Sequence, residues 1–321
     1  MEHILSLSYG KDSLACLGAI EELGWPLDRI IHAEVWATDT IPADLPPMVE
    51  FKTKADAIIK ARWGIEVEHV CAMKDGEKLT YEKIFYRVPK RKPGGQFPEE
   101  SVAGFPYQKG AWCNDRLKTN VLDEISRGGI YGFPIIRGQW CNSMLKLGAL
   151  RMGNKVESVL HGGTQGGGHE KKFFESPRPR GGKNIVQYLG IAADEPNRFH
   201  NLTETKKSPL VEIGWDEAKC RRWCEENDLL SPIYTTATRG GCWFCHNQGI
   251  DQLRLLRRNY PEYWALMLKW DKDSPVTFHP DGRTVHDFDR RFAMEDEGLI
   301  MPDEYFRWSM LDDENLNYRW F

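Results

Sequence analysis

The residues best suited to chemistry near the start of the chain form one run, Ser6-Leu-Ser-Tyr-Gly-Lys-Asp-Ser13. Backbone N–H groups and hydroxyls on such a turn donate hydrogen bonds to phosphate oxygens, and the N-terminus of a following helix favours an anion. Lys11 adds a positive charge on a mobile side chain. We therefore expect this segment to bind phosphate groups.

The spacing within this run does not fit two common phosphate loops. The ATPase P-loop has four residues between its first glycine and a Gly-Lys pair, and the dinucleotide loop reads Gly-x-Gly-x-x-Gly. The run instead resembles the pyrophosphate loop of the adenine-nucleotide α-hydrolase superfamily, usually Ser-x-Ser-Gly-Gly-Lys-Asp-Ser. That superfamily includes ATP pyrophosphatases and phosphoadenosine phosphosulfate (PAPS) reductases. Tyr9 replaces the first loop glycine, and because tyrosine resists positive φ we expect a differently shaped cradle.

The elements around the run predict an α/β fold. Residues 4–5, 29–37 and 65–70 have the apolar or alternating pattern of strands, whereas 14–23 and 48–63 have apolar residues at helical spacing. Strands that alternate with helices imply right-handed crossovers and a parallel sheet. We expect a Rossmann-like sheet with helices on both faces, followed by an α-rich C-terminal region.

Ligands of such sheets bind at the carboxyl ends of the strands, where the run 6–13 and Asp39 both fall. In PAPS reductase-like sequences an Asp-Thr-Gly commonly follows the second strand, and Asp39-Thr-Ile41 takes its place here. A turn-forming role for Asp39, before the prolines that follow, is the alternative.

A later segment extends the resemblance. The superfamily commonly carries Gly-x-Arg-x-x-Glu-Ser near the nucleotide, and Gly190, Glu195 and Arg198 fit that pattern, although Ala192 replaces the arginine. The resemblance implies a nucleotide-binding set of Ser6, Ser8, Tyr9, Gly10, Lys11, Asp12, Ser13, Asp39, Lys146, Gly190, Glu195 and Arg198. Within this set it implies catalytic roles for Lys11, Asp12 and Asp39.

A local duplication precedes that segment. Residues 104–118 recur 28 residues later as 132–146, with nine of fifteen positions identical, including a Trp-Cys-Asn in each copy. Each copy places a cysteine just before an expected helix, whose N-terminus would stabilise a thiolate. PAPS and adenosine phosphosulfate reductases have a related cysteine segment, and Cys141 with Lys146 matches it best. Buried apolar filling is the alternative role for Cys113 and Cys141.

Two more cysteines form a Cys-x-x-Cys knuckle, Cys242 to Cys245, on a Gly-Gly turn. Two thiolates at this spacing can share one metal, but a complete site needs more ligands. Adenosine phosphosulfate reductases and related sulfurtransferases place half of a [4Fe–4S] ligand set after the nucleotide-binding core. The resemblance therefore implies an iron–sulfur cluster, while spacing alone leaves Zn²⁺ open.

The remaining ligands have two sources. Cys113 and Cys141 come from the duplicated segment, and Cys220 and Cys224 lie one helical turn apart, with His246 as a weaker donor. We expect at most one of Cys220 and Cys224 to face the core. The match of Cys141 to the reductases' cysteine segment favours the duplicated segment, so the resemblance implies the metal set Cys113, Cys141, Cys242 and Cys245.

Composition limits the class of protein. The 321 residues have a formal net charge of −4, so no global basic field points to nucleic acid. The absence of a long apolar run or a basic signal-like start predicts a cytoplasmic protein without a membrane segment, in which cysteines are reduced or metal-bound. The basic loops 89–95 and 169–183, the latter within a flexible stretch 162–183, are candidate contacts for nucleic acid. The oligomeric state is open, with a homodimer as a candidate.

Together these features predict a nucleotide-binding unit over 1–215 and a C-terminal helical unit over 216–321 that carries the knuckle. The first functional hypothesis is an enzyme that binds ATP or PAPS with Mg²⁺, adenylates an unidentified acceptor with release of pyrophosphate, and is linked to sulfur transfer. A sulfonucleotide reductase is the second, although residues 315–321 hold no cysteine of the kind that thioredoxin-dependent PAPS reductases use. A non-catalytic nucleotide sensor that acts with a nucleic-acid or protein partner is the third.

Overall fold

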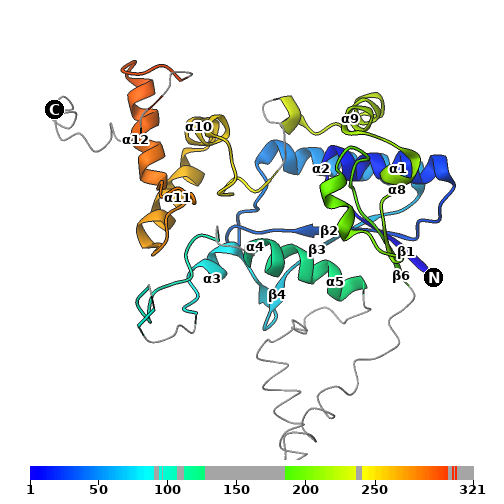
Figure 1. Ribbon diagram of the computed structural model, residues 1–321, viewed down its shortest axis with the longest axis horizontal. Helices are drawn as coiled ribbons and strands as arrows, with labels where there is room; N and C mark the ends of the chain where they lie inside the picture. Colours follow the sequence, from blue (N-terminus) through cyan, green and yellow to red (C-terminus); the bar gives the residue numbers. More distant parts are fainter. Residues whose placement is uncertain are drawn as a thin grey trace, which may run out of the picture.

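The computed structural model describes residues 1–89, 94–95, 97–106, 112–126, 185–235, 241–302, 306 and 308 (Figure 1). The second copy of the duplication, with Cys141 and Lys146, lies outside these residues. The same is true of loop 169–183 and of 90–93 in the first basic loop.

A five-stranded sheet forms the centre of the molecule, in the order β3-β2-β1-β6-β7. All four pairings within it are parallel. Its strands are β1 (Glu2–Ser6), β2 (Arg29–Glu34), β3 (Val67–Cys71), β6 (Ile185–Tyr188) and β7 (Lys206–Lys207). The predicted α/β fold with a parallel sheet is therefore confirmed. Because β1 lies between β2 and β6, the strand order reverses at β1, which is where such sheets bind ligands.

Helices cover one face of the sheet in a compact layer (Figure 1). They are α1 (Lys11–Leu23), α2 (Pro46–Trp63), α8 (Pro209–Ile213) and α9 (Glu217–Glu226). Leu5 and Ile30 point into this layer, whereas their neighbours Ile4 and Ile31 belong to the hydrophobic cluster of the opposite face. This alternation follows from the two-residue period of a strand.

The opposite face carries a continuous helical stretch that begins with the first copy of the duplication. It consists of α4 (Trp112–Asn114), the π-helical turn η1 (Asp115–Thr119) and α5 (Asn120–Ser126). Cys113 lies inside the first turn of this stretch and not before it, so the expected placement is off by one turn. Next to these elements lie a small hairpin, β4 (Met73–Lys74) with β5 (Glu77–Lys78), and α3 (Tyr81–Phe85).

The C-terminal part adds three longer helices, α10 (Ile250–Asn259), α11 (Pro261–Asp273) and α12 (Val285–Asp296). Short 3₁₀ turns, η3 (Pro196–Asn201) and η4 (Pro232–Thr235), precede them. Trp243 and Trp270 from this part stack with ring centroids 5.8 Å apart and planes 9° apart. Both belong to the same hydrophobic cluster as Ile4 and Ile31 of the sheet. One core therefore spans the two units that the sequence predicts.

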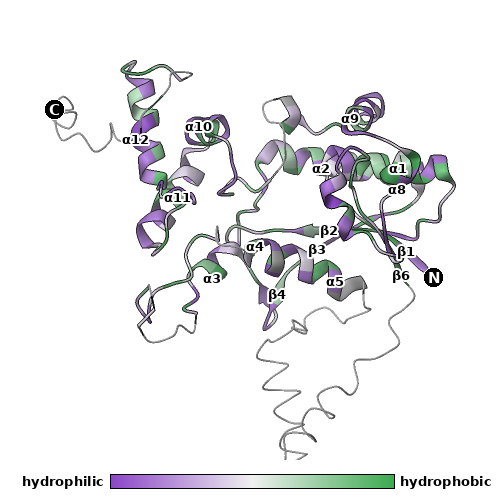
Figure 2. Ribbon diagram, viewed as in Figure 1, coloured by the Kyte–Doolittle hydropathy of each residue, from purple (hydrophilic) through white to green (hydrophobic). Residues whose placement is uncertain are grey.

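Helix α9 corrects one prediction. Most of its residues are hydrophilic (Figure 2), yet Cys220 and Cys224 are both fully buried against α1. The expectation that at most one of them faces the core is wrong, because residues four apart share one face of a helix. Among the described helices, none is both long and apolar enough to cross a membrane.

Candidate functional site

The loop between β1 and α1 contains a positive φ angle at Tyr9. Tyr9 adopts φ 56°, in the left-handed region that a tyrosine rarely occupies. The expectation that Tyr9 would avoid positive φ is therefore wrong, whereas the predicted difference from the superfamily's cradle stays a prediction. An L-residue pays roughly 1–2 kcal/mol for this conformation, so other contacts must compensate.

The compensating contacts are those of the Tyr9 side chain. The Tyr9 side chain is fully buried and its hydroxyl donates to Asp56. Nε2 of His69 lies 3.1 Å from the Tyr9 hydroxyl oxygen. Burial, followed by the neighbouring Asp56, raises the pKa of Tyr9 well above its usual range. The phenol therefore stays neutral and fixes the loop to α2 and β3.

Serine hydroxyls brace the rest of the loop. The Ser8 amide and Ser8 Oγ both donate to Ser13 Oγ, at 3.1 and 3.0 Å, and Ser13 Oγ donates to the Gly10 carbonyl at 2.9 Å. The first turn of α1 leaves backbone N–H groups without intrahelical partners. One of them, the Lys11 amide, donates to the Tyr234 hydroxyl at 3.0 Å, which shows that an oxygen fits at this helix N-terminus.

The Lys11 side chain does not match the expectation of a mobile charge. It is buried, and Nζ forms ion pairs with Asp12 at 2.9 Å and with Glu217 of α9 at 2.8 Å. Burial lowers the pKa of Lys11, but the hydrogen bonds to Glu217 and Asp12 outweigh it, so the pKa lies above the usual value. In this state Lys11 ties α9 to the loop.

Gly190 lies directly against the loop helix. A β carbon at this position would be 2.7 Å from both the α carbon and the backbone nitrogen of Ser13. Only glycine allows this approach. Further along, the Arg198 guanidinium donates to both carboxylate oxygens of Glu195, at 2.9 and 2.8 Å, and Glu195 accepts from the Ala192 amide at 3.1 Å.

These elements enclose a cavity of about 330 Å³, which we call the nucleotide cavity. The predicted residues that line it are Ser6, Ser8, Tyr9, Gly10, Asp12, Ser13, Gly190, Arg198 and Cys242. Lys118, Asp44 and Tyr234 line it as well and were not predicted. Lys11 and Glu195 are not among the lining residues. Each forms an ion pair with a residue that is, Lys11 with Asp12 and Glu195 with Arg198.

Asp39 is not part of this cavity. Its side chain is 64% exposed and forms an ion pair with Lys83 at 2.8 Å. The carboxylate at the cavity wall is instead Asp44, five residues later, which accepts from Lys52 at 2.5 Å. The turn-forming alternative for Asp39 agrees with its exposed position.

Three of the four predicted metal ligands lie close together, and one of them, Cys242, lines the cavity. Cys242 and Cys245 are near enough to Cys113 to raise the pKa of its thiol, Cys245 also raises the pKa of Cys242, and all three cysteines raise the pKa of Lys118. Burial is the main cause for the thiols, bringing the pKa of Cys113 to about 12 and that of Cys242 to about 11. The predicted stabilisation of a free Cys113 thiolate by a helix N-terminus is therefore wrong, because burial outweighs it.

The surroundings of these cysteines fit a bound group that accepts hydrogen bonds. The Tyr81 hydroxyl is buried without a described partner, and its pKa is raised by burial and then by Cys113, Cys245 and Cys242. The Trp112 indole N–H, beside Cys113 in sequence, is also buried without a described partner. Orphaned donors are costly unless an acceptor is present, and metal-bound thiolates and sulfides are such acceptors. The fourth predicted ligand, Cys141, lies outside the described residues.

The alternative cysteines occupy the other face of the sheet. Cys220 and Cys224 are fully buried in the cluster around α1, and Cys224 Sγ donates to the Lys11 carbonyl at 3.2 Å. They therefore belong to a different core from Cys113 and Cys242. The weaker donor, His246, is buried.

A polar network beneath the loop was not foreseen. The His32 ring lies 2.8 Å from the Leu7 carbonyl through Nδ1 and 2.7 Å from Lys52 Nζ through Nε2. Burial, followed by Lys52, lowers the pKa of His32 to about 3. His32, Glu34 and His69 have ligand atoms within 4.8 Å of one another, but both His32 nitrogens are already engaged. We read this group as a hydrogen-bonded support for the loop.

No family model matches this chain, and neither the search of curated proteins nor the search of solved structures finds a match.

Proposed function

We propose that this chain is an enzyme that binds an adenine nucleotide, ATP or PAPS, with Mg²⁺ in the nucleotide cavity. With ATP it adenylates an acceptor with release of pyrophosphate, and this activation is linked to sulfur transfer. The observation that carries the proposal is one shared cavity: the loop 6–13, Gly190 and Arg198 line it from one side, and Lys118 and Cys242 line it from the other.

The loop side supplies anion binding. Backbone N–H groups of the first turn of α1, which lack intrahelical partners, are suited to phosphate oxygens. The Ser8 and Ser13 hydroxyls, which donate within the loop in this state, would have to rotate to donate to a phosphate. Arg198 sits partly exposed beside them, in the wall of the cavity. Preorganised donors aimed at a leaving pyrophosphate stabilise the charge that develops there, which is a main source of acceleration in such reactions.

The cysteine side supplies the link to sulfur. Cys113, Cys242 and Cys245, with Cys141 as the predicted fourth ligand, would hold a [4Fe–4S] cluster, or alternatively Zn²⁺. Such a cluster would supply a place to bind or deliver sulfur next to the nucleotide. Lys118, whose pKa is raised chiefly by Cys242, lines the same cavity and would offer a positive charge to bound phosphates.

A sulfonucleotide reductase is the second candidate. Its chemistry needs a cysteine that reaches the nucleotide, and Cys242 lines the nucleotide cavity. In this reading Cys242 would act as the nucleophile in place of a C-terminal cysteine. The two candidates therefore assign the same residue to different roles.

The test is the thermal shift of anaerobically purified protein with ATP–Mg²⁺ and, separately, with PAPS. A ligand at 100 times its dissociation constant stabilises the fold by about 2.7 kcal/mol, which moves the midpoint by several degrees. A shift with ATP alone supports adenylation, and a shift with PAPS alone supports the reductase. No shift with either overturns both enzyme proposals and leaves a non-catalytic scaffold.

A matched pair of variants locates the binding site. Arg198→Gln should remove most of the shift, since Arg198 lines the cavity. Arg221→Gln is the control because Arg221 forms a comparable exposed pair with Glu225 on α9, at 2.9 Å, outside the cavity lining. Equal shifts in the two variants would contradict the assigned site.

A further inference from the structure

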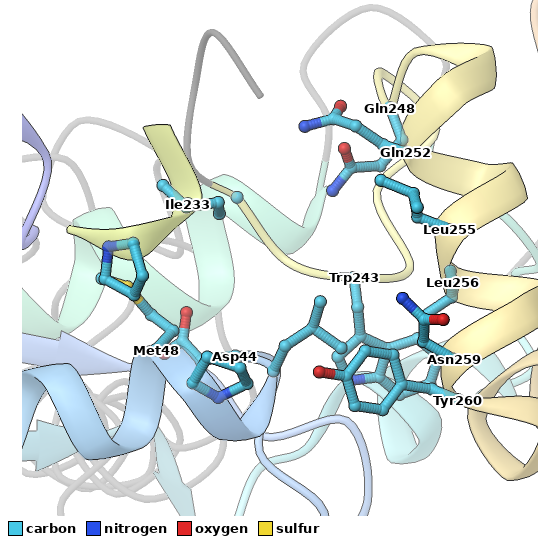
Figure 3. A pocket seen from close by; sticks show the side chains of 14 residues that line it. Asp44, Met48, Ile233, Trp243, Gln248, Gln252, Leu255, Leu256, Asn259 and Tyr260 are labelled. Carbon is cyan, nitrogen blue, oxygen red and sulfur yellow. The ribbon is translucent and has the colours of Figure 1, made fainter. Parts of the chain in front are cut away.

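A second cavity of about 320 Å³ adjoins the nucleotide cavity (Figure 3). It lies between the start of α2, the turn η4 and helix α10. Asp44, Met48, Ile233 and Gly241 line both cavities, so a group held in one is next to a group held in the other. We call it the acceptor cavity.

Rigid aromatic rings form part of its wall. Tyr260 and Trp243 line the cavity, and both stack on Tyr263, with centroids 5.7 and 4.9 Å apart and planes within 20°. Leu255 and Leu256 of α10 add apolar surface beside them. Walls of this kind favour a flat, apolar-faced ligand.

Carboxamides provide the polar contacts. Gln248 and Gln252 extend toward the interior in Figure 3, and each is oriented by one hydrogen bond of its own. Gln248 Nε2 donates to the Cys242 carbonyl at 2.9 Å, which leaves its oxygen as an acceptor. Gln252 Oε1 accepts from the Gly249 amide at 3.1 Å, which leaves its nitrogen as a donor. The pair thus offers at least one acceptor and one donor, as the edge of a nitrogen heterocycle requires.

The charge of the lining separates the two cavities. Among the described residues that line the acceptor cavity there is no lysine or arginine, and Asp44 is the single ionisable acid. The nucleotide cavity, by contrast, has Lys118 and Arg198 in addition to Asp12 and Asp44. Cationic partners for a phosphate are therefore present in the nucleotide cavity, whereas the acceptor cavity offers none among its described lining residues and suits a neutral ring.

We propose that the acceptor cavity binds the acceptor of the reaction as a neutral, planar nitrogen heterocycle of nucleobase size. This inference rests on the proposed function, because it places the acceptor beside the activated nucleotide. The heterocycle comes either from a free nucleoside or from a base that is turned out of a nucleic-acid strand, and both present the same edge and face.

The test uses the four neutral ribonucleosides, which carry no phosphate, and short single-stranded oligonucleotides. Binding is followed by saturation-transfer NMR on the full chain. We expect a signal for at least one nucleoside, and a decrease of at least fivefold in apparent affinity in Leu255→Trp, which fills the cavity from a partly exposed position on α10. Binding of an oligonucleotide at least tenfold tighter than the nucleoside identifies a strand as the source, and equal binding identifies a free nucleoside.

Two further variants protect the test against misfolding. Asn259→Ala removes an exposed carboxamide from the cavity rim and should weaken nucleoside binding severalfold. Val49→Trp adds the same ring to an exposed position on α2 outside the lining and should leave binding unchanged.

The nucleoside-binding test and the thermal-shift test of the proposed function can fail independently. The thermal shift with ATP–Mg²⁺ or PAPS should be the same in Leu255→Trp and in the natural chain. If Leu255→Trp abolishes that shift, the cavity holds the nucleotide's own base and the inference is overturned. It is also overturned if neither nucleosides nor oligonucleotides give a signal that Leu255→Trp removes. Failure of the nucleotide shift in the natural chain would overturn the proposed function instead.

Discussion

The backbone of Ser13 lies so close to Gly190 that a β carbon on the glycine would be 2.7 Å from two Ser13 atoms. Two segments 177 residues apart in the sequence are therefore in direct backbone contact at the start of α1. The contact joins the end of β6 to the loop that follows β1, and both line the nucleotide cavity.

Gly190→Ala should destabilise the fold and weaken nucleotide binding together. The neighbouring atoms are backbone and cannot move aside as a side chain can, so we expect a loss of roughly 1–3 kcal/mol in unfolding free energy. Urea unfolding checks it. Gly241→Ala is the control, since among the described residues no atom beyond the chain neighbours lies within 4 Å of its added β carbon. Equal stability of the two variants would show that the segments separate in solution.

The His69 ion pairs should make stability depend on pH above neutrality. Hydrogen bonds to Asp56 and then Glu34 raise the pKa of His69 to about 9, above its value near 6.5 in an unfolded chain. The stabilisation is therefore complete below about pH 6.5 and is lost as the pH rises through 9. The difference in unfolding free energy between the natural chain and His69→Gln should be about 1 kcal/mol at pH 6 and smaller at pH 9.5.

The control for this pH dependence is Lys60→Gln, because the Lys60–Glu66 ion pair contains no imidazole. Its effect should be the same at pH 6 and pH 9.5. A constant effect of His69→Gln over this range would contradict a charged His69 in the folded chain.

Metal content should separate the two groups of cysteines. Serine variants of Cys113, Cys242 and Cys245, and of the predicted ligand Cys141, should each lower the iron or zinc bound per anaerobically purified chain. Cys224→Ser should leave it unchanged, since Cys224 lies in the core of the opposite sheet face. Elemental analysis decides between iron and zinc. Metal loss in Cys224→Ser alone would reverse the assignment.

Tyr81→Phe should affect the metal-free protein and the cluster-bound protein differently. Without metal, the variant removes a buried hydroxyl that has no described partner, so we expect it to be neutral or to stabilise the fold by about 1 kcal/mol. With an iron–sulfur cluster bound, the variant removes a donor to sulfur, so the reduction potential should fall. Urea unfolding of the apo form and redox titration of the loaded form measure these effects. A destabilised apo variant with an unchanged potential would show that the hydroxyl has another role.

Short-range patterns in the sequence predicted the secondary structure and the parallel sheet. The order of apolar and small polar residues around 6–13 was sufficient for the strand, the loop and the parallel sheet. The contacts of the site come instead from residues far apart in sequence, such as Lys11 with Tyr234, 223 positions later. Asp44 was missed in favour of Asp39 because both follow the same strand, and only the bend of the intervening turn decides which faces the cavity.

Burial explains the other errors. The sequence could not show that Cys113 would be desolvated, or that Lys11 would find Glu217 on a helix from another part of the chain. Tyr9 looked unsuited to positive φ because the compensating hydroxyl contacts with Asp56 and His69 come from α2 and β3.

The anchored Tyr9 has a consequence for the rate of ligand capture. A glycine at this position would leave the loop free to sample many shapes, and each binding event would have to select one of them. Here the conformational entropy is lost during folding, before any ligand arrives. Association should therefore proceed in a single kinetic phase whose rate is proportional to ligand concentration, without a plateau set by loop closure.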